Sequence, residues 1–268
     1  MITRELPRER ARLVRSLLAA CTVLTLVACA SPGTTDASSP ASRYGDLVGR
    51  PQSMLKLARA SLASHDYASA VNLYRSALAA NPQDPTIRVE LGDALVDAGS
   101  FDDATDAYNH IDAKSPQRPH ALLGLMRVEL ALNEPAKALA YADTANAIAP
   151  HDIRVLIGRG VSLDAMGRHA DAQLSYRAVI AAEPQNLAAR NDLALSLALT
   201  GSFDEAIQIM EPIALSSDAT TRSRQNLALI YGLKGDEAKA ASLSRLDLDP
   251  STAAANLRLF KIVRTSEN

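Results

Sequence analysis

The feature that most constrains this chain is an internal repeat with a period of 34 residues. Three residue types share this interval, and the alanine series runs without a gap. The series are Pro82, Pro116, Pro150 and Pro184; Ala70, Ala104, Ala138, Ala172, Ala206 and Ala240; and Gly99, Gly167, Gly201 and Gly235. A unit of this length cannot bury its hydrophobic face alone, so neighbouring units have to stack into one array.

Each period predicts two antiparallel helices joined by a tight turn. The alanine marks where the second helix approaches the first, and a larger side chain there would cost about 1–3 kcal/mol. Glycine suits the turn because it adopts positive φ freely, and proline ends the second helix. The facing positions of the first helix are also mostly small: Ala58, Gly92, Met126, Gly160, Ala194 and Ala228.

The period and the residue types resemble the tetratricopeptide repeat (TPR), a helix–turn–helix unit. The second unit shows the pattern best, with Leu91, Gly92, Leu95, Gly99, Phe101, Ala104, Tyr108 and Pro116. The resemblance implies an all-α solenoid, a right-handed superhelix of about six repeats over residues 51–254. The units are 51–84, 85–118, 119–152, 153–186, 187–220 and 221–254. We expect residues 251–268 to form a C-terminal capping helix and tail, with Ser251 to Val263 helical.

The first 28 residues predict a signal peptide. Five arginines precede an uncharged apolar run from Ser16 to Ala28, which is too short for a spanning helix of about 20 residues. The run ends in Leu26-Val27-Ala28-Cys29, which resembles a bacterial lipobox. That resemblance implies cleavage before Cys29, acylation of Cys29 and, with Ala30 next, sorting to the outer membrane, where the lipid-anchored protein faces the periplasm. The alternative is an ordinary secreted protein with a chance cysteine.

Residues 29–50 predict the lipidated Cys29 followed by a flexible linker rich in Ser, Thr, Pro and Gly. Cys21 would leave with the signal peptide, so no thiol would remain for a disulfide, a metal or catalysis. The formal net charge of −2 becomes about −5 after removal of five Arg and two Glu. This acidity argues against nucleic acid as a partner.

The sequence offers no set of residues for catalysis. The five histidines include no i, i+4 pair, and HExxH, GxSxG, P-loop and GxGxxG motifs are absent. Nearly every residue after the linker belongs to a repeat, which leaves no room for a catalytic domain. We therefore predict a protein that is not an enzyme and that uses no metal, no cofactor and no small-molecule substrate.

The TPR resemblance also implies where a protein partner binds. The first helix of each repeat lines the concave groove of such arrays, and a paired Lys/Asn and Lys/Arg clamp for a carboxylate is absent here. An apolar row with a few charges would suit an amphipathic segment, although the same apolar residues could simply be core. The candidate groove residues are Arg59, Asp93, Leu123, Arg127, Ile157, Asn191 and Gln225.

The C-terminal third of the sequence resembles a narrower family within the TPR proteins. The segments from Arg190 to Ala194 and from Arg224 to Asp236, with Glu211-Pro212 before the second, resemble the TadD family. TadD proteins are TPR lipoproteins of the tight adherence (Flp pilus) assembly system. The resemblance implies an accessory that helps a secretin or another pilus-assembly component. The alternatives are a type IV pilus pilotin, an outer-membrane protein assembly lipoprotein, or a periplasmic enzyme-associated adaptor.

Overall fold

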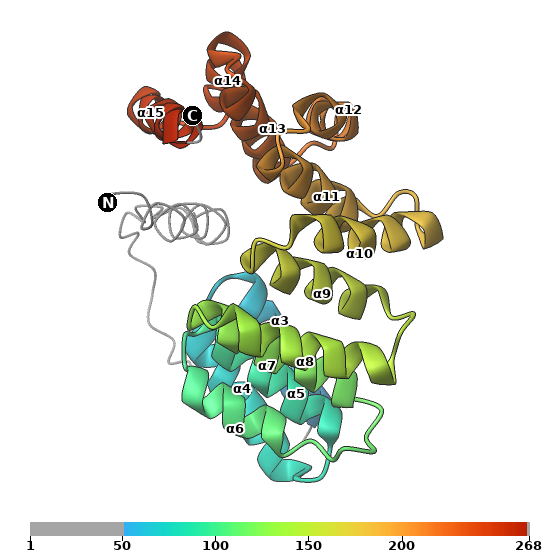
Figure 1. Ribbon diagram of the computed structural model, residues 1–268. Helices are drawn as coiled ribbons and strands as arrows, with labels where there is room; N and C mark the ends of the chain where they lie inside the picture. Colours follow the sequence, from blue (N-terminus) through green and yellow to red (C-terminus); the bar gives the residue numbers. More distant parts are fainter. Residues whose placement is uncertain (1–50, 267–268) are drawn as a thin grey trace, which may run out of the picture. The chain divides into compact units, whose positions relative to one another are not determined.

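The computed structural model describes residues 51–266, and in this range it contains thirteen helices and no strand (Figure 1). The predicted signal peptide, Cys29 and the linker lie outside the described residues. Among the described helices, none has the length and apolar character needed to cross a membrane. The described chain divides into two compact units, an N-terminal unit (51–150) and a C-terminal unit (151–266), which we describe separately.

The N-terminal unit consists of three helix pairs, and we call the first helix of each pair helix A and the second helix B. Each helix B packs against its own helix A and, within the unit, against the next helix A along the chain. Met54, Ala77 and Ile87 join the first three helices in one buried cluster. The six helices are α3 (Pro51–Ala63), α4 (Tyr67–Ala80), α5 (Pro85–Asp97), α6 (Phe101–Asn109), α7 (Arg118–Ala131) and α8 (Pro135–Ile148).

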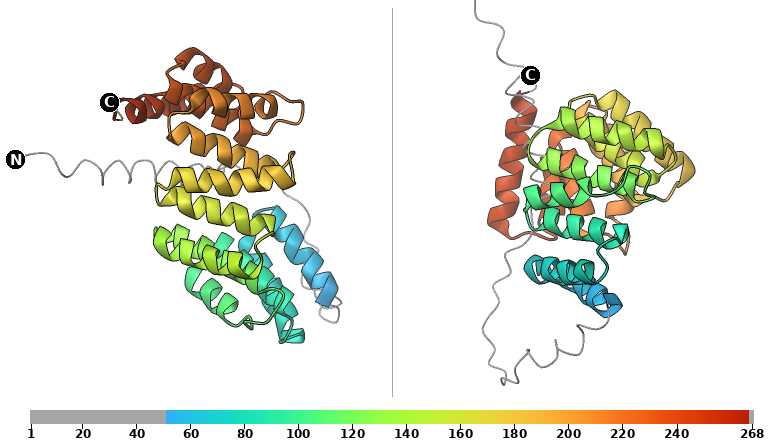
Figure 2. Two further views of the ribbon diagram at one scale, coloured as in Figure 1. Left: turned by 45° about the vertical axis from the view of Figure 1, so that its right-hand side comes forward. Right: turned by 90° about the horizontal axis from the view of Figure 1, so that it is seen from below.

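The C-terminal unit repeats this arrangement three times and adds one helix (Figure 2). Its helices are α9 (Ile153–Ala165), α10 (His169–Ala182), α11 (Leu187–Leu199), α12 (Phe203–Ala214), α13 (Thr221–Lys234), α14 (Glu237–Ser244) and α15 (Pro250–Ser266). The additional helix α15 packs against α13 and α14. Phe260 of α15 lies against Gly232, where a Cβ would come within 2.5 Å of its ring. The predictions of an all-α helix–turn–helix fold and of a terminal capping helix are confirmed.

The repeat register predicted the points of closest helix contact. All six alanines of the period are completely buried, and so are Ala58, Ala194 and Ala228 on the facing helices. The turn glycines adopt the left-handed conformation, with φ between 74° at Gly99 and 99° at Gly235. The two repeats without glycine there do the same, with φ of 61° at His65 and 60° at Asn133. The turn is therefore set by the packing of the helix pair and not by glycine alone.

Candidate functional site

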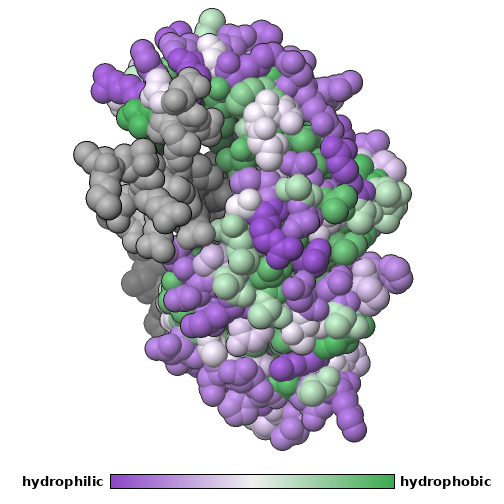
Figure 3. Space-filling view, in the orientation of Figure 1, coloured by the Kyte–Doolittle hydropathy of each residue, from purple (hydrophilic) through white to green (hydrophobic). Residues whose placement is uncertain are grey.

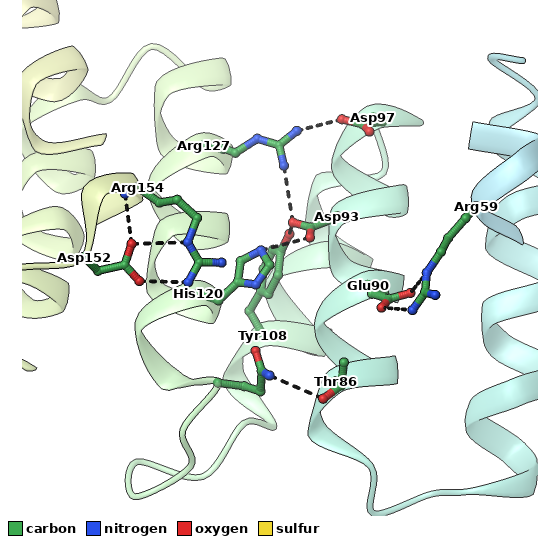
Figure 4. Close-up of polar contacts among 11 residues, drawn as sticks. Arg59, Thr86, Glu90, Asp93, Asp97, Tyr108, His120, Arg127, Asp152 and Arg154 are labelled. Carbon is green, nitrogen blue, oxygen red and sulfur yellow. Dashed lines mark hydrogen bonds and ion pairs between the residues drawn. The ribbon is translucent and has the colours of Figure 1, made fainter. Parts of the chain in front are cut away.

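In the N-terminal unit, the charged residues of the helix A faces bind one another across repeats (Figure 4). Arg59 of α3 donates two hydrogen bonds to Glu90 of α5, with Nε–Oε2 at 3.1 Å and Nη2–Oε1 at 2.5 Å. The arginine is 57% exposed and the glutamate 21%. Such a bidentate pair fixes the orientation of both groups, so Arg59 is exposed but already has a partner.

Asp93 of α5 is the centre of a second cluster, which joins α5, α6 and α7 (Figure 4). Its Oδ1 accepts the Tyr108 O–H at 2.7 Å and an Arg127 N–H at 3.3 Å. His120 Nε2 lies 3.1 Å from the other carboxylate oxygen, Oδ2. Arg127 also donates to Asp97 at 2.6 Å. We call Asp93, Asp97, Tyr108, His120 and Arg127 the Asp93 cluster.

Tyr108 reaches this cluster because two glycines leave room for its ring. A Cβ at Gly92 would lie 2.5 Å from the ring, and one at Gly124 would lie 2.1 Å from it. The tyrosine is completely buried, and its O–H emerges beside Asp93. Burial first, and the negative charge of Asp93 second, raise the pKa of the Tyr108 phenol. The phenol therefore stays neutral and acts as a hydrogen-bond donor.

In the C-terminal unit, a chain of amide hydrogen bonds crosses from α13 to α11. Asn226 Nδ2 donates to Asn191 Oδ1 at 2.6 Å, and Asn191 Nδ2 donates to Asp192 Oδ1 at 3.1 Å. Asn226 is 4% exposed, while Asn191 and Asp192 are half-buried. We call these three residues the amide chain. Burial is the main reason that the pKa of Asp192 rises to about 6.

Beside the amide chain, Asp164 of α9 is buried and fully supplied with hydrogen bonds. It accepts from Ser196 Oγ at 2.8 Å and from the Tyr176 O–H at 3.0 Å, and His169 Nδ1 lies 2.7 Å away. Its side chain is 7% exposed. Burial and the charges of Asp164 and Asp192 raise the pKa of the Tyr176 phenol, so it too remains a donor. This cluster fixes α9, α10 and α11 to one another.

Gln225 of α13 belongs to a third polar group, which ties α13 to the turn after α14. Arg224 forms a two-point ion pair with Asp247, with Nε–Oδ2 at 2.8 Å and a shorter contact from Nη2 to Oδ1. Gln225 Nε2 donates to Asp247 at 3.3 Å, while its buried Oε1 has no partner within the described residues. The hydrogen bonds from Arg224 hold the pKa of Asp247 below its ordinary value.

The predicted groove residues differ in how far their side chains are exposed to solvent. Leu123 is buried at 8% exposure, as is Val89 at the same position of the preceding repeat, at 1%. In the C-terminal unit the corresponding face stays half-buried and more apolar, and its exposed edge includes Ala188. Its half-buried apolar members are Ile157, Val161, Leu195 and Leu229. Figure 3 shows apolar and polar side chains interspersed on the face drawn.

Several residues of these clusters were not among the predicted ones. Glu90, Asp97, His120 and Tyr108 all contact predicted residues. Opposite charges about one repeat apart were the available signal, because equivalent positions of successive helices lie side by side. The same signal marks two exposed pairs between helices B, Arg75–Asp103 and Arg177–Glu205, both with 2.6 Å contacts. Within the described residues, no group of three or more His, Cys, Asp or Glu side chains could hold a metal ion.

The helix pairs and their shared register define an α-helical repeat protein. Comparison with known families identifies the repeat family to which the chain belongs. A tetratricopeptide repeat model matches residues 55–119 and 157–218, and a second one matches residues 95–157. Together these matches cover more than half of the chain. The chain belongs to the tetratricopeptide repeat family, whose members are generally non-enzymatic scaffolds for protein–protein interaction.

Individual relatives add little beyond the family. Uncharacterized protein y4yS of Sinorhizobium fredii is 32% identical over 90 residues, which cover 34% of this chain and 50% of the relative. Cellulose synthase 1 operon protein C of Komagataeibacter xylinus is 26% identical over 220 residues, which cover 81% of this chain and 16% of the relative. The chain thus spans half or less of the length of these curated relatives.

Solved structures agree on the fold. A thermophilic TPR protein of Thermus thermophilus superposes with a TM-score of 0.61 at 22% identity, over 67% of this chain and 98% of that one. PilW, described as a widely conserved type IV pilus biogenesis factor, superposes with a TM-score of 0.63 at 18% identity, over 78% of this chain and 96% of that one. Identities this low show the shared fold alone.

Proposed function

We propose that this protein is a lipid-anchored TPR scaffold at the periplasmic face of the outer membrane, without enzymatic activity of its own. In this role it binds protein partners and assists the assembly of a pilus or secretion machine. The observation that carries the binding role is the face formed by α9, α11 and α13. There, half-buried apolar side chains such as Val161, Leu195 and Leu229 lie beside the side-chain amides of Asn191 and Gln225.

This face suits an amphipathic segment of a partner. Half-buried aliphatic side chains provide apolar area, at roughly 25 cal/mol for each Å² that a partner covers. The Asn191 amide uses one N–H and one lone pair within the protein, and its second N–H and second lone pair can hydrogen-bond a polar group of the segment and so fix its orientation. The helix A faces of α3, α5 and α7 are less suitable, since Arg59, Asp93 and Arg127 already bind within the protein.

The assignment to the tight adherence system rests on the resemblance to the TadD family. Its segments, Arg190–Ala194 and Arg224–Asp236, include part of the face formed by α11 and α13. A secretin or another Flp pilus component is therefore the proposed partner. The likeness to PilW concerns the fold, and it makes a related pilus lipoprotein the alternative to test against.

Site-specific photo-crosslinking in the native cell tests the binding role. A photo-reactive amino acid at Ala188 or Leu229 lies on the proposed face, whereas Gln208 on helix B α12 is an exposed control. We expect the first two positions, and not Gln208, to capture a secretin or pilus-assembly protein. Capture of a type IV pilus component would favour the related pilus lipoprotein, and capture of an outer-membrane protein assembly component would favour that further alternative. Equal capture from all three positions would refute binding at this face.

The membrane anchor needs a separate test, because Cys29 lies outside the described residues. The tetrad Leu26-Val27-Ala28-Cys29 supports acylation, and two or more acyl chains anchor a protein stably. Cys29→Ser should abolish fatty-acid labelling and release the protein from the outer-membrane fraction. Unchanged membrane retention of the variant would contradict the anchor and leave the binding role standing.

A further inference from the structure

The amide chain of Asn226, Asn191 and Asp192 has a direction that depends on one proton. Each amide offers an N–H donor end and a carbonyl acceptor end, and an ionised carboxylate can only accept. The observed bonds therefore run from Asn226 to Asn191 and from Asn191 to Asp192. An ionised Asp192 permits only this order, because a carboxylate has no proton to donate to Asn191.

The surroundings of Asp192 favour its neutral form. From α9, the negative charge of Asp164 disfavours a second charge nearby, and from α10 the Tyr176 O–H is already donated to Asp164 at 3.0 Å. His169 of α10 is likewise engaged with Asp164, at 2.7 Å. From α13, the positive charge of Arg222 opposes this effect through space.

Neither α12 nor the rest of α11 supplies a charge that neutralises Asp192. No charged group of α12 contributes to the shift of its pKa. On α11 itself, Arg190 reaches the Ile209 carbonyl oxygen at 3.4 Å and Gln185 at 3.4 Å. Asp192 thus has one hydrogen-bond donor, Asn191, and no ion pair within the described residues. Its pKa of about 6 lies in a range where the group changes its charge near neutral pH.

A protonated Asp192 has an O–H to donate, and the nearest acceptor is the Asn191 side chain. To accept this bond, the Asn191 amide has to turn so that its oxygen faces Asp192. Its Nδ2 then faces Asn226, which must turn its own oxygen inward to accept. One proton on Asp192 thus makes the reversed order available to both amides, and in that order the new O–H has an acceptor inside the chain while all three side chains keep their places.

We propose that Asp192, Asn191 and Asn226 form a proton-operated switch that reverses this hydrogen-bond chain and exchanges the donor and acceptor ends of the half-buried Asn191 amide on the face of α11. Asn191 and Asp192 share their helix face with Ala188 and Leu195, one turn to either side. The consequence for a partner rests on the proposed function: a segment that hydrogen-bonds to the Asn191 amide would bind differently above and below a pH of about 6.

Nuclear magnetic resonance of the purified protein tests the switch without any partner. The measured quantities are the ¹³C shift of the Asp192 carboxyl and the ¹⁵N shifts of the Asn191 and Asn226 side-chain amides, as functions of pH. Asn191→Ala and Asn226→Ala assign the two amide signals. We expect all three groups to titrate with one midpoint near 6.

Two variants and a control separate the switch from a general effect of pH. Asp192→Asn should remove both amide titrations and hold the amide shifts near their low-pH values, since a neutral side-chain amide can donate as the protonated acid does. Asp192→Ala should remove the titrations without producing those values. Asp218→Asn, at an exposed turn residue, should leave every titration in place.

Three results would overturn the proposal. They are an Asp192 carboxyl that titrates near its ordinary range of about 4, amide shifts that do not follow the Asp192 midpoint, and amide titrations that persist in Asp192→Asn. None of these results bears on partner binding, which the crosslinking experiment tests independently. A failed crosslinking experiment would in turn leave the switch intact.

Discussion

Gly124→Ala offers a sharp test of how the Asp93 cluster is built. The new Cβ would lie 2.1 Å from Tyr108 Cζ and 2.5 Å from each Cε atom, so the ring has to move. Tyr108 is completely buried and its O–H donates to Asp93 at 2.7 Å. Overpacking costs about 1–3 kcal/mol, and loss of a hydrogen bond to a charged group costs about 1.5–3 kcal/mol.

One contribution to the change in the free energy of unfolding has the opposite sign. Replacing a glycine inside a helix by alanine stabilises the helix by roughly 0.5–1 kcal/mol. The net expectation for Gly124→Ala is therefore a loss of about 3 kcal/mol in the free energy of unfolding. Urea unfolding followed by far-ultraviolet circular dichroism measures this quantity, with an error smaller than the expected effect.

A second background makes the reasoning refutable. Tyr108→Leu removes the three ring atoms that the new Cβ would meet. In that background Gly124→Ala should become stabilising, by about 0.5–1 kcal/mol, because only the helix propensity remains. A reversal of sign between the two backgrounds would support the close approach of α7 to Tyr108. An equal loss in both would show that the ring is not what limits position 124.

The remaining predictions concern charge and backbone strain in single repeats. Burial raises the pKa of Asp192 from 3.8 to about 6, so the folded protein holds that proton more tightly than the unfolded chain and loses stability as pH rises from about 4 to about 6. In urea unfolding, Asp192→Asn should therefore gain up to about 3 kcal/mol near pH 8 and almost nothing near pH 4; a gain that does not change with pH would contradict this. Gly201→Ala should lower the melting temperature by the equivalent of about 1 kcal/mol through its φ of 79° alone, since no atom beyond the adjacent residues lies within 4 Å of the new Cβ. His65→Gly should raise the melting temperature, and equal signs for the two variants would disprove a backbone cause. Asp247→Ala should destabilise the protein, because Arg224 and Gln225 lose the carboxylate that accepts their hydrogen bonds, and an unchanged midpoint in chemical unfolding would show that water replaces the carboxylate.

The strict 34-residue period of the sequence predicted the structural features that recur in every repeat. Because each repeat meets its neighbours in the same way, one position per repeat had to carry the same small residue, and the six period alanines are completely buried. The turn was only partly predictable. A glycine in the sequence predicted four of the six left-handed turn residues, but His65 and Asn133 adopt the same conformation although they are not glycines. There the packing of the helix pair overrides the preference of the residue.

The candidate binding face depended more on tertiary structure. Arg59, Asp93 and Arg127 were predicted to face a partner, but each is bound to another side chain of the N-terminal unit, and Leu123 is buried in its core. A sequence fixes the face of a helix on which a residue lies. The separation of two helices decides whether a side chain on that face reaches water, a neighbouring charge or the core.

By itself, then, the sequence determined the helix pairs, their register and the places where small residues allow close packing, because these follow from local periodicity. Tertiary structure alone decided which polar groups are satisfied and which stay available. Asn191 illustrates the difference: its position on α11 follows from the repeat, while its bonds to Asn226 and Asp192 require two helices to meet at one distance. Hydrogen bonds between repeats form or fail over fractions of an ångström in the distance between donor and acceptor. The spacing of residues along the sequence does not give the distance between two helices.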